Sequence, residues 1–392
     1  MDENEKRAAR RGAVMGAAVM LAVCLLAGWR LLPGYGSHLQ MMIKLGQIVD
    51  TVDRNYVGDF ESELLGDMAA YGMIRSLDDR YSTYLPASTV EAYEANKYGE
   101  TFGVGIQCVW DEERQAAHVY RVLEGSSALE QGLAPGDWLI AADDVTAAED
   151  GYDAMVAAIR GEEGTEVAVT FQRGTAALET RMMERRRLTQ LMAEGELLDG
   201  GIGLIRIFSF HQGVSEQFRA AYEALQKQGM EKLIIDVRHD NGGLVSEMAE
   251  IADQFLPECD IMIMRRKNGH ETRKVSDAAQ DPIPMAVLVD EQSYSAAEFF
   301  AALMQEYGRA VTVGEQTTGK ERAQDTYHLA DGSAIVLSDR KYLTPQERAL
   351  GETGMTPDIL VALPEGTNFY FMSKAEDLQL SAAVEALQEG GK

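Results

Sequence analysis

Cysteine is scarce in this chain of 392 residues, which contains only Cys24, Cys108 and Cys259. The three residues form no CxxC pair and no Cys/His spacing that suggests a metal site. Because Cys24 lies in an apolar N-terminal stretch, at most one disulfide could form. The sequence therefore predicts neither a metal site nor a disulfide framework.

Basic residues are also few, since Lys and Arg number 36 against 63 Asp and Glu. The resulting net charge of −27 would repel a polyanion at every phosphate contact, so we expect no nucleic-acid partner. Disorder is not indicated either, because 46% of the residues are hydrophobic and only 25% are charged. The length fits two or three folded domains.

The only long hydrophobic run covers residues 13–29 and follows a basic segment at residues 6–11. As a helix it would be about 25 Å long, and residues 30–32 can extend it toward the roughly 30 Å of a hydrocarbon core. No good A-x-A site follows, so an uncleaved anchor over residues 13–32 is favoured over a cleaved signal peptide or a buried core helix. We expect a single-pass protein of the cell membrane, with residues 37 onward outside the cytoplasm.

Residues 37–97 carry helical periodicity, behind a cytoplasmic tail and membrane anchor at residues 1–36. In "LQMMIKLGQIVDTVDRNYV" apolar residues recur on one helical face, and "ELLGDMAAYGMIRSL" repeats the pattern. We predict a small N-terminal helical region.

From residue 98 short strands appear, broken by Gly and Asp, as in "TEVAVTFQRG" with its strict alternation. The order of "FGVGI", "GSSALEQGLAPGDWLIAADD" and "AIRGEEGTEVAVTFQR" resembles a PDZ domain over residues 98–187. The resemblance implies that one loop clamps a peptide's C-terminal carboxylate and that the next strand pairs with the peptide. The loop residues are Phe102, Gly103, Val104, Gly105 and Ile106. The alternative is an ordinary small sandwich whose glycines only make turns.

Residues 188–392 alternate between strand and helix patterns, as in "KLIIDVR", "PMAVLVD" and "AAEFFAALMQEYG". This alternation predicts a largely parallel sheet with functional residues beyond the carboxyl ends of its strands. The whole chain is thus predicted to be an α/β (α+β) multidomain protein.

Ser295 stands at the start of a predicted helix, directly after the strand "PMAVLVD". The helix dipole and the N–H of Ala296 would favour an oxyanion there, as in a strand-turn-helix nucleophile elbow. However, the four residues from Ser295 to Glu298 also form a capping box, which is far commoner than a nucleophile.

The six histidines show no triad signature, although His239, beside a glycine pair, is the best candidate base among them. A lysine can replace histidine if burial disfavours its charged form. Lys320 would lie at the same sheet edge as Ser295 if the two preceding strands are neighbours. The sequence therefore allows a Ser-Lys dyad.

Several motifs together resemble the carboxyl-terminal processing proteases, the tail-specific serine peptidases with a Ser-Lys dyad and an inserted PDZ domain. They are "LDDRYSTYL", "DVRHDNGG", "SAAE", "TTGKERAQ" and "YLTPQERALGETGMTPDILV", and the resemblance covers residues 40–362. It implies that Ser295 is the nucleophile, Lys320 the general base and Gln324 the residue that orients the lysine. It places the oxyanion-hole N–H groups on Gly242 or Gly243 and on Ala296.

The sequence departs from the family pattern at four places. Arg80 stands where proline is usual, and Gln292 and Tyr294 replace small residues before the nucleophile. Residues 321–323 replace the usual G-S-V after the lysine. Because Glu321 would favour a charged Lys320 if it pointed inward, we expect its carboxylate to point to solvent.

Two other functions compete with this interpretation. Residues 314–320 fit the G-x-x-x-x-G-K of a phosphate-binding loop, but Glu321 occupies the Ser/Thr position and the next segment, "TYHLADGSAIVL", predicts a hairpin instead of a helix. The chain could also be a PDZ peptide-binding scaffold of the same fold that has lost its chemistry.

The sequence favours a membrane-anchored serine endopeptidase that acts on protein or peptide substrates with flexible C-termini. It would need no metal or cofactor. The last amphipathic helix, near the C-terminus, is interpreted as a packing or interface element, and a homodimer is one use it could serve.

Overall fold

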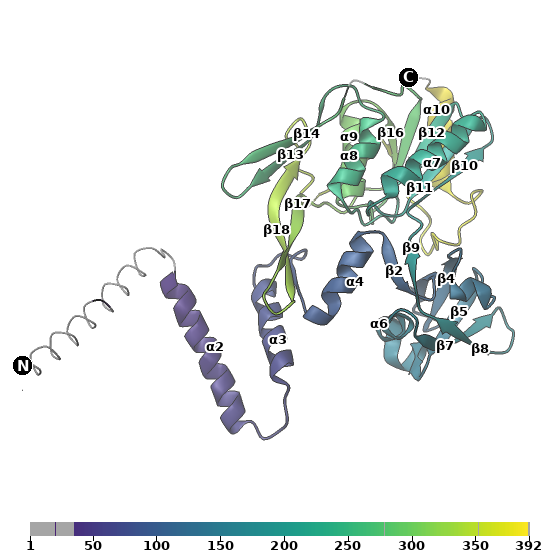
Figure 1. The fold of residues 1–392 in the computed structure, drawn as a ribbon. Coiled ribbons are helices and arrows are strands. Elements are labelled where there is room, and N and C mark those ends of the chain that lie inside the picture. The colour runs from purple at the N-terminus through teal and green to yellow at the C-terminus, as the bar shows by residue number, and fades with distance from the viewer. Residues whose placement is uncertain (1–19, 21–34, 278, 352, 391–392) are drawn as a thin grey trace, which may run out of the picture. The chain divides into compact units, whose positions relative to one another are not determined.

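The computed structural model describes residues 20, 35–277, 279–351 and 353–390 (Figure 1). Apart from Met20, the predicted anchor at residues 13–32 lies outside these residues. No helix in the described part of the chain is long and apolar enough to span a bilayer.

The chain divides into two compact units, Met1–Met68 and Ala69–Lys392. In the first unit, α2 (Tyr35–Asn55) forms where the sequence has helical periodicity. The helix α3 (Ser62–Arg75) begins in the same unit.

The second unit contains a six-stranded sheet (Figure 1). Its order is β10-β11-β12-β15-β16-β19, and all its strands are parallel except β10, which pairs antiparallel with β11. The strands are β10 (Ala193–Leu198), β11 (Ile202–Ile207), β12 (Lys232–Asp236), β15 (Met285–Val289), β16 (Val311–Gly314) and β19 (Ile359–Leu360). The predicted largely parallel sheet is confirmed.

Helices cover both faces of this sheet because its strands are apolar on both sides. Leu233 and Ile235 of β12 pack into one core with α7 (Val214–Lys227), α8 (Val245–Asp253) and α9 (Ala296–Glu306). Ile234, between them, packs into a second core with Leu380 and Ala383 of α10 (Leu378–Glu389). Alternation along single strands therefore fixes which helices lie on which side.

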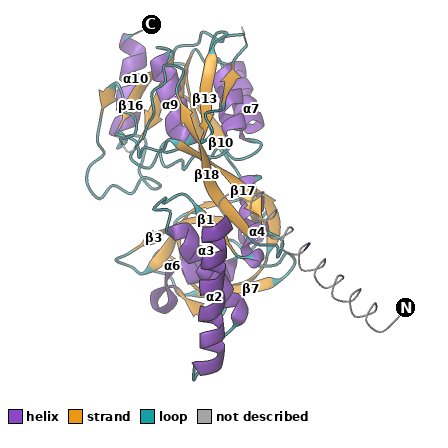
Figure 2. Ribbon diagram, turned by 90° about the vertical axis from the view of Figure 1, so that its left-hand side faces the viewer, coloured by secondary structure: helices purple, strands orange, loops and turns teal. Residues whose placement is uncertain are grey.

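A second, antiparallel sheet has the order β1-β18-β13-β14, with β17 paired to β18 (Figure 2). Its strands are β1 (Thr83–Leu85), β13 (Asp260–Arg266), β14 (Glu271–Val275), β17 (Arg322–His328) and β18 (Ala334–Leu343). The hairpin of β17 and β18 was predicted, whereas β13 and β14 were not. The strand β1 comes from the region predicted to be helical, next to α4 (Ala87–Lys97).

Six of the remaining strands form a separate sheet with its own core, which we call the β-domain (residues 104–184). Its order is β3-β4-β5-β7-β8, and β6 pairs with β5. The elements are β3 (Ile106–Asp111), β4 (Ala116–Val122), α5 (Ser127–Glu130), β5 (Asp137–Ala142), β6 (Val145–Thr146), α6 (Ala147–Ile159), β7 (Glu166–Arg173) and β8 (Glu179–Glu184). A two-stranded ribbon of β2 (Glu100–Gly103) and β9 (Arg186–Thr189) flanks the domain in the sequence.

Candidate active site

Ser295 is the N-cap of α9, in the turn after β15. Its backbone has φ 60° and ψ −123°, a region that residues other than glycine rarely adopt and that stores strain at functional sites. The helix behind it is rigidly held, because every residue from Ala296 to Met304 is buried. A strained serine on a buried helix has the local geometry of a strand-turn-helix nucleophile elbow.

Glu298 makes the capping contact predicted from the sequence and a second contact that was missed. The backbone N–H of Ser295 donates to Glu298 Oε1 over 2.9 Å, which is one half of the capping box. The other oxygen, Oε2, accepts from Thr317 Oγ1 over 2.8 Å and from the N–H of Gly319 over 3.0 Å. This fully buried carboxyl group, whose pKa burial raises, therefore ties the serine turn to the loop that carries Lys320.

Lys320 is only 8% exposed, and burial lowers the pKa of its ammonium group to about 8. The charges of Glu298 and Asp79 oppose this shift. Lys320 Nζ donates to Gln324 Oε1 over 2.9 Å, and Gln324 Nε2 donates in turn to the Tyr81 carbonyl over 2.7 Å. The Tyr81 ring covers the lysine, with its centroid 4.5 Å from Nζ.

Ser295 and Lys320 both line one cavity of about 1040 Å³. Their strands, β15 and β16, are parallel neighbours, as the sequence argument required. Among the described residues no hydrogen bond joins the two side chains directly, and the lysine donates to Gln324. The structure thus brings the candidate nucleophile and the candidate base to one cavity, with the lysine held by Gln324.

The two glycines predicted for the oxyanion hole differ. The N–H of Gly242 donates to Asp240 Oδ1 over 2.7 Å, so it is already used. Gly243 is exposed and lines the cavity, and in the described part of the chain neither its N–H nor that of Ala296 donates to another group. Of the predicted oxyanion donors, the structure therefore leaves the N–H groups of Gly243 and Ala296 available, whereas that of Gly242 is used by Asp240.

Gly242 nevertheless must be glycine. Its φ is 85°, and a Cβ at this position would lie 2.8 Å from both Ser295 Cβ and the Ala296 nitrogen. Asp240, which holds Gly242, is completely buried, and burial raises the pKa of its carboxyl group well above the usual value. Its Oδ2 has no hydrogen-bond partner in the part of the chain that the structure describes.

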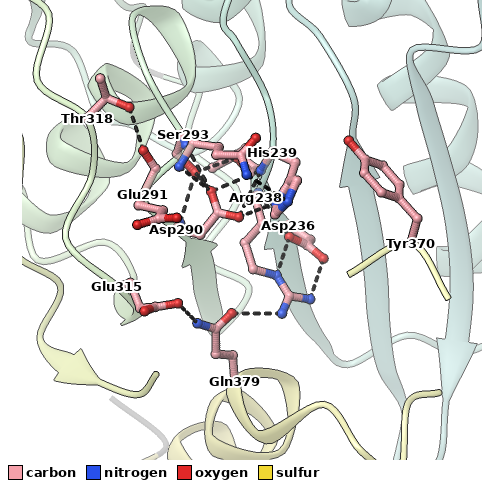
Figure 3. Close-up of polar contacts among 12 residues, drawn as sticks. Asp236, Arg238, His239, Asp290, Glu291, Ser293, Glu315, Thr318, Tyr370 and Gln379 are labelled. Atoms are coloured by element: carbon pink, nitrogen blue, oxygen red, sulfur yellow. Dashed lines mark hydrogen bonds and ion pairs between the residues drawn. The ribbon is translucent and has the colours of Figure 1, made fainter. Parts of the chain in front are cut away.

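His239 is not placed to act as the base. Its Nδ1 contacts Asp290 Oδ2 and its Nε2 lies 3.2 Å from Gln292 Nε2, so both ring nitrogens are turned to these two side chains (Figure 3). No group of three or more His, Cys, Asp and Glu side chains in the described residues could hold a metal ion.

The residues that depart from the family pattern make defined polar contacts in the structure. Glu321 pairs with Lys341 on β18, so its carboxylate is turned away from Lys320, although it is only 20% exposed and not free in solvent as expected. Arg80 donates to the Gly319 carbonyl over 3.1 Å, in the loop before Lys320. The N–H of Tyr294 donates to the Asp240 carbonyl over 3.2 Å.

The phosphate-loop interpretation of residues 314–320 is wrong, because the strand β17 follows the loop where a helix is required. Gly314 has a different reason to be glycine. A Cβ there would lie 1.9 Å from the Val289 carbonyl oxygen, so it allows β16 to approach β15 closely.

The predicted peptide-binding loop joins β2 to β3. Phe102 and Gly103 end β2, and Ile106 begins β3 and lines the same cavity as Ser295. The carbonyls of Val104 and Gly105 accept from Ala128 (3.0 Å) and Leu123 (2.9 Å), which fixes the loop against the rest of the β-domain. Within the described residues, β3 pairs only with β4, so its outer edge is open.

Comparisons with known proteins agree with this geometry. Residues 201–361 match peptidase family S41. A Staphylococcus saprophyticus protein described as a CtpA-like serine protease is 28% identical over 327 residues, which is 82% of this chain and 66% of the relative. The carboxyl-terminal-processing protease of a Synechocystis species is 30% identical over 324 residues, or 81% of this chain and 76% of the relative. The chain spans just under two thirds of the length of the staphylococcal relative.

Two solved structures share the fold. The photosystem II D1 C-terminal processing protease has a TM-score of 0.51 at 22% identity, over 81% of this chain and 87% of that chain. An S41-type protein from Bacteroides fragilis has a TM-score of 0.56 at 15% identity, over 81% of this chain and 90% of that chain. The family match and the 30% identity to the Synechocystis relative, over 76% of its length, show that the chain belongs to the carboxyl-terminal processing proteases of peptidase family S41.

Proposed function

We propose that this protein is a membrane-anchored serine endopeptidase that cleaves peptide bonds with Ser295 and Lys320 and recognises substrate C-termini through the β-domain, acting as a PDZ module. One observation carries the proposal. Lys320 is buried on the same cavity as a serine in a strained strand-to-helix turn, and its lowered pKa of about 8 supplies a base near neutral pH.

In the first step, neutral Lys320 accepts the Ser295 Oγ proton while Oγ attacks the scissile carbonyl. The N–H groups of Gly243 and Ala296 stabilise the oxyanion that forms. Lys320 then gives the proton to the leaving amine as the C–N bond breaks, which leaves an acyl ester on Ser295. Lys320 then takes a proton from a water molecule as that water attacks the ester. As the bond between Oγ and the acyl carbon breaks, Lys320 returns the proton to Ser295 Oγ and the carboxylic acid product leaves.

Gln324 keeps the lysine in place without changing its charge. Its amide accepts from Lys320 Nζ and donates to the Tyr81 carbonyl, so the lysine is oriented by a neutral partner. A carboxylate at this position would favour the ammonium form and remove the base.

The open edge of β3 supports the peptide-recognition part of the proposal. An extended peptide can add to this edge, with its C-terminal carboxylate at the loop of residues 102–106. Ile106 and Gln107 line the cavity that also holds Ser295, so a peptide on this edge lies on the surface that leads to the nucleophile.

The location of the protein is proposed from the sequence alone. The hydrophobic run at residues 13–32, behind the basic segment, supports a single-pass anchor with the catalytic part outside the cytoplasm. The substrates would then be extracytoplasmic proteins with flexible C-termini. The proposed assembly is a homodimer, and the mass of the purified protein in solution tests it.

The test uses the full chain in detergent, as wild type, Ser295→Ala, Lys320→Ala and the exposed control Lys267→Ala. Each is incubated at pH 8 with an unfolded protein that ends in small apolar residues, and the fragments are identified by mass spectrometry. We expect cleavage by wild type and Lys267→Ala only. Cleavage by all four would assign the activity to another site or to a contaminant.

The scaffold alternative is separated by two further measurements. A serine-directed fluorophosphonate should label wild type and not Ser295→Ala. If the protein is a scaffold without chemistry, the probe will label neither of them. The same substrate with an amidated C-terminus tests the recognition step, because loss of the terminal carboxylate should raise KM if the β-domain binds it. An unchanged KM would contradict that part of the proposal.

A further inference from the structure

The Asp290 carboxylate joins the two loops that form the candidate active site (Figure 3). From the loop after β12, the backbone N–H of His239 donates to Oδ1 over 3.0 Å and its ring Nδ1 contacts Oδ2. From its own loop after β15, Asp290 Oδ1 accepts from the N–H groups of Gln292 (3.0 Å) and Ser293 (2.9 Å). One buried carboxylate therefore connects the loop that leads to Gly243 with the loop that leads to Ser295.

The His239 ring is enclosed on its remaining sides. Phe369 stacks on it with centroids 4.1 Å apart and planes within 6°, and Tyr370 contacts it edge-on at 5.4 Å. Gln292 Nε2 lies 3.2 Å from the ring Nε2. If this amide donates, Nε2 is the acceptor and Nδ1 carries the proton that is given to Asp290. The side chain is 18% exposed and has no freedom to swing toward the cavity without breaking these contacts.

The backbone at His239 is strained, with φ 57°. A left-handed conformation at a residue other than glycine is unfavourable and persists only where the surroundings hold it. The residues after this turn contact the turn that carries Ser295. Gly242 lies against Ser295, and the Tyr294 N–H donates to the Asp240 carbonyl. The position of Gly243 relative to Ser295 thus depends on the turn at His239.

We propose that His239 is a positioning residue: held between Asp290 and Phe369, it fixes the loop that carries Gly243 against the turn that carries Ser295 and Ala296. This inference rests on the proposed function, because the two N–H groups matter only if they stabilise an oxyanion. It assigns no proton transfer to the histidine. Oxyanion donors act through geometry, and a displacement of about 1 Å can lower the rate on the order of 100-fold.

The first test compares His239→Ala, His239→Asn and wild type in the full chain with the unfolded substrate. His239→Ala should lower kcat on the order of 10- to 100-fold and leave KM within about twofold, because the peptide contacts are untouched. His239→Asn should recover most of the lost kcat, since asparagine tolerates the left-handed region and its amide can donate to Asp290. The exposed His270→Ala is the matched control and should behave as wild type.

A double-mutant cycle with Phe369→Ala tests whether the effect of the Phe369 ring on kcat depends on its stacking with His239. If it does, Phe369→Ala should lower kcat in the wild-type background and change it little in the His239→Ala background. Fully additive losses would overturn the inference, as would equal loss in His239→Ala and His239→Asn or an unchanged kcat in both.

Hydrogen exchange supplies a measurement that does not depend on activity. In His239→Ala the hydrogen-bonded amides of Gly242 and Leu244 should exchange faster than in wild type, while those of the β-domain stay unchanged. If wild type cleaves nothing but these two amides still exchange faster in His239→Ala, the positioning of the loop is supported and the peptidase proposal fails. If cleavage is normal and the exchange of Gly242 and Leu244 does not change, the inference fails alone.

Discussion

Lys320 Nζ donates a hydrogen bond of 2.9 Å to Gln324 Oε1, so the group that holds this buried lysine is a neutral amide. Most buried lysines in proteins are paired with a carboxylate, which keeps them charged. Here the directly bonded partner is neutral and burial lowers the pKa to about 8. The pairing therefore keeps the lysine in place while leaving it able to lose its proton.

The activity should rise with pH. In the proposed mechanism only neutral Lys320 can accept the serine proton, and the neutral fraction of Lys320 increases as the pH passes about 8. We expect kcat/KM to increase by about tenfold per pH unit below this value and to level off above about pH 9. Initial rates between pH 6 and 10 measure the profile, and a profile that is flat or falls over this range would contradict the lysine base.

Changing Gln324 should separate its two effects. Gln324→Ala removes the contact and should lower kcat on the order of 10- to 100-fold with little change in KM. Gln324→Glu keeps the shape but adds a negative charge, so the pKa of Lys320 should rise and the pH–rate profile should move to higher pH. The exposed Gln346→Glu serves as the control for an added charge. A profile that stays in place in Gln324→Glu would show that the lysine is not the titrating group.

Burial of Lys320 should reduce the stability of the folded protein below pH 8. The folded pKa of about 8 lies below the ordinary value of 10.5, so between these values the unfolded state binds more protons and stability rises with pH. Lys320→Met should therefore raise Tm at pH 7, by the equivalent of about 1–3 kcal/mol, and the gain should shrink toward pH 10.5. Thermal unfolding of Lys320→Met beside Lys267→Met at both pH values measures it. A Tm at pH 7 equal to that of wild type would contradict the shifted pKa.

Gly242→Ala should abolish turnover without unfolding the chain. Its Cβ would lie 2.8 Å from Ser295 Cβ, so the loop has to move away from the nucleophile. We expect a loss of kcat on the order of 100-fold or more. The matched control is Gly229→Ala, which also has a positive φ (93°) but open space around the new Cβ. Equal loss of activity in both variants would point to strain and not to the contact with Ser295.

The sequence predicted the parts of this site that depend on local pattern. Strand-helix alternation placed Ser295 after β15, and the spacing of the lysine motif placed Gln324 four residues after Lys320. The sequence could not predict contacts between distant segments. Tyr81 supports Gln324 from 243 residues away, and nothing in its neighbourhood indicates that partner. The contact between Asp240 and the Gly242 N–H is local, but it lies in a turn next to the strained backbone at His239, and the sequence pattern did not indicate that strain.

The unpredicted hairpin of β13 and β14 has a similar explanation. The strand β14 is exposed along its whole length, so it lacks the alternation by which a half-buried strand is recognised. It forms because β13 offers a paired edge in the antiparallel sheet. Pairing in space, and not local composition, decides such a segment.

The support of Lys320 has a consequence for the order in which the protein is made. Chains emerge from the ribosome N-terminus first, and domains fold as they appear. Tyr81 and β1 are synthesised early, but their partners Gln324 and β18 follow more than 200 residues later. Until Gln324 and β18 have been synthesised and β18 has paired with β1, Lys320 lacks its hydrogen bond to Gln324, and Gln324 lacks its contact with the Tyr81 carbonyl. A nascent chain that has not yet reached β18 therefore lacks the assembled candidate site, because Gln324 and the paired strand are still missing.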